Sequence, residues 1–136
     1  MIRKDFVEAE IQKLAQVLAR ILGLKNDGNI DDATQMAYDT LTEYYHLDTE
    51  KLHTLSVEEF QEVIKSGNYS AEKLNLLAQI LFESVYPFQD TEETYTILHK
   101  TAAVITLLET EYRQQTLENI SRREMIDKFL NNQQYE

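Results

Sequence analysis

The sequence predicts an all-α protein, and three observations lead to this prediction. The chain of 136 residues contains one proline and three glycines, so few residues interrupt regular structure. Apolar residues recur at three- and four-residue steps, and no segment alternates with the two-residue period of a strand. A Ser or Asp followed three residues later by Glu, the signature of a helix N-terminus, occurs at Ser56, Asp90 and Ser121. We expect no β-sheet.

Two long helices are expected at the start of the chain, over residues 3–24 and 30–47, with Asn29 as the N-cap of the second. The second helix carries small residues at Ala33 and Ala37, which we expect to pack closely on the first helix. The main apolar stripe of the first helix consists of Val7, Ile11, Leu14 and Leu18, followed by Ile21 and Leu22.

The rest of the chain is expected to form further helices, giving about six to seven in one domain over residues 1–136. A chain of this length buries a core without help from a disulfide or a metal, and there is no cysteine. The expected segments are a short helix over 49–55, one from Ser56 to Gly67, one from Ser70 to Tyr86, one from Asp90 to about Arg113, and a last one opened by Ser121.

The acidic turn before the second helix does not fit a calcium loop. With Gly28 at the glycine position of an EF-hand, Lys25 would stand where an acidic ligand is needed, and Thr34 would replace the final glutamate. The turn is therefore interpreted as the hinge of a helical hairpin.

Gly28 and Asn29, followed by Ala33 and Ala37, resemble the second-helix signature of a tetratricopeptide repeat. Ile11–Gly28 and Leu55–Phe60 resemble an uncharacterised family of short bacterial tetratricopeptide-like helical proteins. The resemblance implies antiparallel helical hairpins in a right-handed array. It implies no activity, since none is established for that family.

The net charge of −11 is unevenly distributed along the chain. Residues 26–66 carry ten acids and two bases, whereas residues 1–25 carry five bases and three acids. An acidic middle repels phosphate, so nucleic acid is not expected as a partner. No stretch approaches the roughly 20 apolar residues of a membrane span, and the expected setting is the cytoplasm, away from membranes.

Two Glu-x-x-His pairs raise the possibility of a metal site: Glu43 with His46, and Glu50 with His53. This spacing places a carboxylate and an imidazole on one helix face, as in di-iron helical bundles. Such a site needs the two pairs on facing helices, and here they lie seven residues apart. A metal-dependent helical-bundle enzyme that uses these four residues is therefore the alternative hypothesis.

The favoured hypothesis is a non-catalytic protein–protein interaction or scaffolding module, with no catalytic residue, metal or cofactor assigned. A purely structural homodimer is a third possibility. The sequence contains no glycine-rich phosphate loop, HExxH motif or arrangement typical of a catalytic triad.

A second, sparser stripe on the first helix is the candidate partner-binding face. It consists of Ile2, Phe6, Val17 and Leu24, with Lys13 and Arg20 on the same side. Two alternatives follow for this stripe: internal helices cover it, or it contacts a protein or peptide, including a second copy of the chain. The residues assigned to partner binding are Phe6, Lys13, Val17, Arg20 and Leu24.

Overall fold

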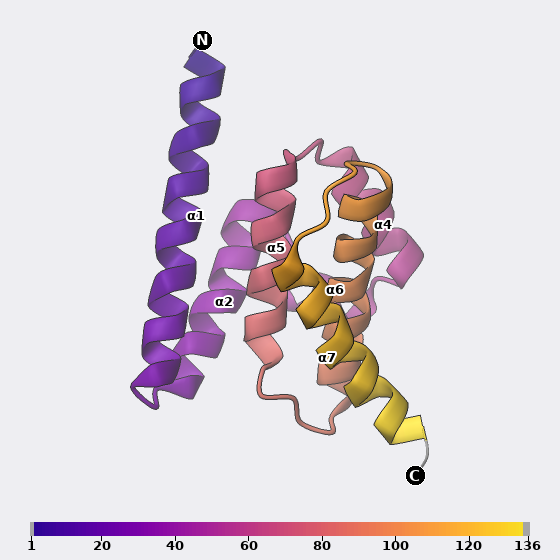
Figure 1. Ribbon diagram of the computed structural model, residues 1–136. Coiled ribbons are helices and arrows are strands. Elements are labelled where there is room, and N and C mark those ends of the chain that lie inside the picture. Colours follow the sequence, from indigo (N-terminus) through magenta and orange to yellow (C-terminus); the bar gives the residue numbers. More distant parts are fainter. Residues whose placement is uncertain (1, 135–136) are drawn as a thin grey trace.

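The computed structural model describes the backbone of residues 2–134 and the side chains of residues 7–132. Within this part of the chain the structure is built from helices and contains no strand, which confirms the all-α prediction (Figure 1). The helices are α1 (Ile2–Asn26), α2 (Ile30–Tyr45), α3 (Thr49–Thr54), α4 (Val57–Ser66), α5 (Ala71–Val85), α6 (Glu92–Thr110) and α7 (Leu117–Gln134).

The helix α5 lies at the centre of the fold. It packs on α1, α2 and α6, and α7 packs on α6 and runs in front of it in Figure 1. A helix that is apolar on several faces must have several neighbours, and α5 has this character. Its buried residues are Leu74, Leu76, Leu77, Ala78, Ile80, Leu81, Phe82 and Ser84.

The helices α1 and α2 pack together through the residues that the sequence predicts. Leu14 and Ile21 of α1 and Ala33 and Ala37 of α2 are buried in the same core cluster. Small side chains allow two helix axes to approach closely, so the alanines suit this contact. The N-terminal part of α1 extends beyond the other helices (Figure 1).

Three tyrosines tie the helices together at one end of the core. The hydroxyl of Tyr45 donates to the carbonyl of Lys73 at 2.6 Å, and the hydroxyl of Tyr112 donates to the carbonyl of Tyr69 at 2.8 Å. The ammonium of Lys73 lies 2.7 Å from a carboxylate oxygen of Glu10 and 4.7 Å from the centre of the Tyr69 ring. Burial, together with the charge of Glu10, raises the pKa of Tyr45, so this phenol stays a hydrogen-bond donor.

The helix starts at Ser56 and Ser70 are confirmed. Ser56 accepts a hydrogen bond from the backbone amide of Glu59, and the carboxylate of Glu59 accepts one from the backbone amide of Ser56. Ser70 accepts a hydrogen bond from the amide of Lys73 and caps α5 in the same way. Asn29 occupies the N-cap position of α2, but its side chain makes no capping hydrogen bond.

The other two predicted helix starts are wrong. Thr91, not Asp90, caps α6 and accepts from the amide of Thr94, while Asp90 accepts a hydrogen bond from the hydroxyl of Tyr95. The last helix begins at Leu117 and not at Ser121, because Thr116 caps the amide of Asn119. Thr116, five residues upstream, thus performs the function that the sequence pattern assigns to Ser121.

The helix C-termini differ from prediction by a few residues. The helix α2 ends at Tyr45, because His46 adopts a left-handed conformation (φ 57°) and its amide donates to the carbonyls of Leu41 and Thr42. The helix α6 ends at Thr110, three residues before the expected boundary. Boundaries of this kind depend on terminal turns that fray and tighten.

The α1–α2 contact can be tested by enlarging a small residue. Ala37 is fully buried, so Ala37→Leu adds three carbon atoms where there is no space, and we expect it to lower the free energy of unfolding by about 1–3 kcal/mol. Ala19→Leu is the matched control, because Ala19 is exposed on α1 and the larger side chain fits there. Chemical denaturation measures both effects. Equal stability of the two variants would contradict close packing at Ala37.

Candidate functional site

The residues assigned to partner binding from the sequence fall into two groups in the structure. Val17 and Leu24 are half-buried and pack against the main core. These two residues of the second stripe are therefore covered by other helices of the same chain. Lys13 and Arg20 are exposed. The side chain of Phe6 lies outside the described side chains. The strongly exposed apolar residues of α1 are instead Val7 and Leu22, which belong to the main stripe whose Leu14 and Ile21 are buried.

The four residues of the alternative metal site do not form a ligand group. Glu43 is exposed on α2, and His46 follows it at the left-handed C-cap. Glu50 and His53 lie on the short helix α3, across the break at Asp48. Among the described residues, no three His, Asp or Glu side chains lie close enough together to hold a metal ion.

The structure places His53 near a carboxylate that the sequence does not single out. Its Nε2 lies 3.8 Å from Glu93 at the start of α6, and the hydroxyl of Tyr38 donates a hydrogen bond to the same carboxylate. Glu93 and Tyr38 border a hollow of about 400 Å³ between α2, the end of α5 and the start of α6. This α2–α6 hollow also includes Asp31, Thr94 and Tyr86.

The chemistry of the α2–α6 hollow does not favour catalysis. Burial raises the pKa of Tyr38, and the hydrogen bond and negative charge of Glu93 raise it further. The phenol is therefore protonated near neutral pH and is a poor nucleophile or base. The carboxylates Asp31 and Glu93 stand in the first turns of α2 and α6, where negative charge stabilises the helix dipole.

A second hollow has a larger set of exposed apolar side chains than the first, which is lined by Ile30 and shares Tyr86. This open groove, here called the α5–α7 groove, has a volume of about 510 Å³ and lies between the end of α5 and the first half of α7. Leu117 is 82% exposed, Tyr86 40% and Met125 36%. The residues that line the groove are Phe82, Glu83, Tyr86, Leu117, Glu118, Ser121, Arg122 and Met125.

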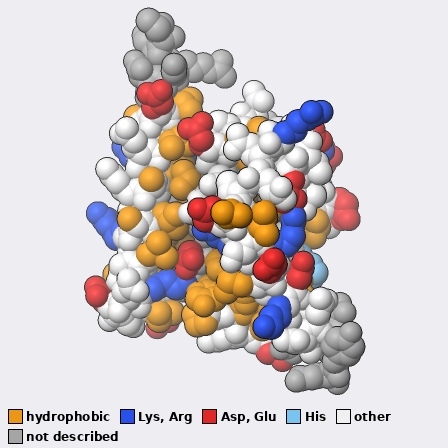
Figure 2. Space-filling model, viewed as in Figure 1, with side chains coloured by type: hydrophobic (Ala, Val, Ile, Leu, Met, Phe, Trp, Pro, Cys, Tyr) orange, Lys and Arg blue, Asp and Glu red, His pale blue; other side chains and the backbone are white. Residues whose placement is uncertain are grey.

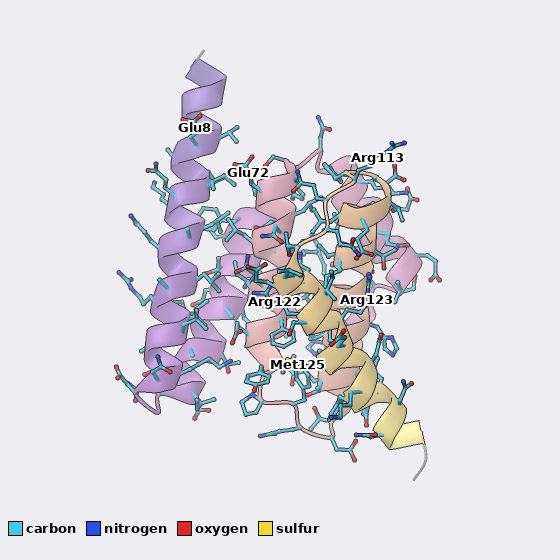
Figure 3. The ribbon with its side chains drawn as sticks, viewed as in Figure 1. Glu8, Glu72, Arg113, Arg122, Arg123 and Met125 are labelled. Carbon is cyan, nitrogen blue, oxygen red and sulfur yellow. The ribbon has the colours of Figure 1, made fainter. Side chains whose placement is uncertain are left out.

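The space-filling view shows how these side chains gather on one face (Figure 2). Hydrophobic side chains follow α1 along the left of the view and collect again below the centre, with charged groups between them. Arg122 and Met125 project from α7 on this same face (Figure 3). The groove therefore lies on a partly apolar surface between α1 and α7.

Hydrogen bonds and rings hold the walls of the groove in place. Asn119 of α7 is buried and donates to the side-chain oxygen of Asn75 on α5 at 2.7 Å, and Arg123 bonds Glu109 of α6 at 2.6 Å. Below the groove, the ring of Phe82 packs on Tyr86 and Phe88 with centroids 5.5 and 5.2 Å away. Such contacts position α7 without help from a ligand.

Charges in the groove are partly compensated. The ammonium of Lys25 on α1 donates to the carboxylate of Glu83 at 2.7 Å and lies 5.3 Å from the centre of the Tyr86 ring. Arg122 donates to the side-chain oxygen of Asn119 at 2.8 Å. Burial lowers the pKa of Arg122, whereas the charges of Glu83 and Glu118 act in the opposite direction.

Sequence reasoning missed this groove for an identifiable reason. The sequence predicts that the last helix opens at Ser121, which leaves Leu117 in a connection between two helices, whereas Thr116 caps α7 directly before Leu117. The signal that could have revealed it is Thr116-Leu-Glu-Asn119, a cap followed by an apolar residue in the first helical turn.

Comparison of the chain with protein-family models, with curated proteins and with solved structures finds no match. The resemblance to the uncharacterised bacterial family therefore stays a prediction. Within the described residues, no helix is both long and apolar enough to cross a membrane.

One further charged side chain is unusual, although it lines neither hollow. Lys100 of α6 is 2% exposed, and its ammonium lies 5.9 Å from the centre of the Phe60 ring. No carboxylate accepts an ion pair from Lys100 among the described side chains. Burial lowers the pKa of this amine, because the charged form loses part of its hydration.

Removing this amine is expected to stabilise the protein near neutral pH. In the unfolded chain the amine regains its ordinary pKa, so the unfolded state binds more protons between the lowered pKa and about 10.5. The penalty is complete below the lowered pKa and disappears as pH rises through that window. Lys100→Met should therefore raise the free energy of unfolding at pH 7, and the gain should shrink towards pH 10.5.

Urea denaturation of the parent and the variant at several pH values measures this difference. The tyrosines titrate in both proteins, so their contribution cancels. Lys128→Met, which removes an exposed amine from α7, is the control and should change stability little at any of these pH values. A destabilised Lys100→Met variant at pH 7 would show that the amine contributes net stability.

Proposed function

We propose that the protein is a non-catalytic interaction module and that the α5–α7 groove is its docking surface for another protein or peptide. One observation carries the proposal. Among the described residues, six large hydrophobic side chains are strongly exposed. Leu117 and Met125 line this groove together with Tyr86, which also borders the α2–α6 hollow beside Ile30. Scattered apolar side chains are normal on a surface, whereas a gathered set is typical of an interaction site.

The construction of the groove supports the same function. Its floor rests on the ring cluster around Phe82, and α7 is bonded to α5 through Asn119 and to α6 through Arg123. A surface that is held in place before binding loses little conformational entropy when a partner arrives. The exposed apolar area then contributes directly to the affinity, because water leaves it on binding.

We further infer that α1–α2 and α5–α6 form the hairpins of the predicted tetratricopeptide-like array. Each pair packs together, and only residues 27–29 separate α1 from α2. Hairpin arrays expose long surfaces between their helices, and a groove for a partner is the usual use of such a surface. The metal-dependent enzyme is the weaker hypothesis, since Glu43, His46, Glu50 and His53 make no ligand group.

The proposal can be tested by capturing partners from a lysate of the cells that make the protein. The immobilised parent is compared with the double variant Leu117→Ser and Met125→Ser, which removes two exposed apolar side chains from the groove without disturbing the core. Ile30→Ser is the matched control, because Ile30 is also exposed (42%) but lies outside the groove. Mass spectrometry identifies the retained proteins, and circular dichroism verifies that each variant is helical.

We expect the groove variant to lose at least one protein that the parent and the Ile30→Ser control retain. Retention of the same proteins by all three would place the interaction elsewhere and contradict a docking role for the groove. If the groove variant and the Ile30→Ser control lose the same proteins, binding depends on exposed apolar side chains in general. The groove beside α7 then has no special role.

A further inference from the structure

We propose that the partner segment is an amphipathic helix with a basic polar face, which lies on α5 between α1 and α7. The proposal rests on the docking role of the α5–α7 groove and adds the chemical nature of its occupant. Three observations support it: the shape of the surface, the distribution of its apolar side chains, and the balance of its charges.

The shape suits a helix because one side of α5 is only partly covered. Asn119 of α7 reaches Asn75 and Lys25 of α1 reaches Glu83, while the rest of this side stays accessible between the two flanking helices. Glu72, Asn75, Gln79, Glu83 and Tyr86 follow one another at three- and four-residue steps and so share one face of α5. None of these five residues is buried, in contrast to the residues on the other faces. In Figure 1, α1 and α7 stand on either side of α5.

The length of this surface matches a short helix. The 15 residues of α5 correspond to a length of about 22 Å at 1.5 Å per residue. A partner helix of about 15 residues could therefore follow α5 between its two flanking helices, as amphipathic helices do in other hydrophobic grooves.

Apolar side chains stand along both edges of the surface. Leu117 and Met125 lie on the α7 side and Tyr86 lies at the lower end. On the α1 side, Leu22 is 42% exposed and lies one turn before Lys25, whose ammonium reaches Glu83 on α5. An apolar stripe on the partner would cover these side chains.

The charge balance favours a basic partner. Both bases at the groove already face acids, Lys25 through its ion pair with Glu83 and Arg122 through its proximity to Glu83 and Glu118. At the other end of the surface, Glu8 on α1 and Glu72 on α5 lie on neighbouring parts of the two helices (Figure 3).

Glu8 and Glu72 are exposed, and neither forms an ion pair with a described side chain. Glu8, Glu72, Glu83 and Glu118 thus stand along the surface against Lys25 and Arg122, and the nearby ion pair of Lys73 with Glu10 adds no net charge. The net charge of −11 adds a long-range attraction for a basic segment and repels an acidic one.

The probe for this proposal is a fluorescently labelled helical peptide of 18 residues made of leucine, alanine and lysine, with the leucines on one face. Two matched peptides accompany it. One has glutamate in place of every lysine. The other has the same amino-acid composition as the first peptide, but its residues are rearranged so that the leucines no longer share one face of the helix. Fluorescence anisotropy at about 0.15 M salt measures binding, since such salt screens exposed charges beyond roughly 8 Å.

We expect the parent protein to bind the first peptide about tenfold or more tightly than either matched peptide. The Leu117→Ser and Met125→Ser double variant should weaken that binding about tenfold, whereas Ile30→Ser should not. Glu72→Gln with Glu118→Gln should also weaken it several-fold. Glu58→Gln with Glu62→Gln removes the same charge from α4, where both acids are exposed, and should have little effect.

Two results would overturn the proposal in distinguishable ways. In the first, the lysine and glutamate peptides bind the parent equally and the Leu117→Ser and Met125→Ser variant binds neither. This result would support the docking role of the groove and refute a basic partner. In the second, the two lysine peptides, with and without an apolar face, bind equally, and the groove variant binds them as tightly as the parent does. This result would show attraction by net charge alone and refute a helical occupant of the groove. In that case the capture experiment decides the docking role separately.

Discussion

The structure depends on the burial of α5. This helix is apolar over most of its circumference, and an exposed helix of that kind would leave many large side chains in water. Its surroundings follow from this constraint: α1 and α2 cover one side, and α6 covers another. Only the polar strip that begins at Glu72 and ends at Tyr86 needs no cover, and the candidate site lies over its lower end.

The polar contacts at the edges of α5 decide how far each neighbour extends over it. At one end, Lys73 joins Glu10 of α1, while the hydroxyl of Tyr45 joins the Lys73 carbonyl. At the other end, Lys25 of α1 joins Glu83. Between them, Asn119 holds α7 against Asn75. Partly buried ion pairs of this kind contribute little net stability, but they disfavour other arrangements of the helices.

The two hollows show why apolar exposure is the better guide to function in this protein. The α2–α6 hollow contains carboxylates and two tyrosines beside the exposed Ile30, but the Tyr38 phenol is already bonded to Glu93 and has a raised pKa. Tyr38 and Glu93 thus satisfy each other. In the α5–α7 groove the exposed side chain of Leu117 has no apolar partner that would remove it from water, so burial there by another molecule would be favourable.

The sequence by itself determined the helical class and the caps at Ser56 and Ser70. It also determined that Ala33 and Ala37 form a buried face of α2. These features depend on neighbours within a few residues along the chain. The tertiary structure decided which residues of the two apolar stripes of α1 are covered, and it leaves Leu22 of the main stripe exposed while Val17 and Leu24 of the second stripe pack against the core. It also decided the site. Residues 82–86 and 117–125 meet only because α6 returns the chain along α5, and no local pattern encodes that contact.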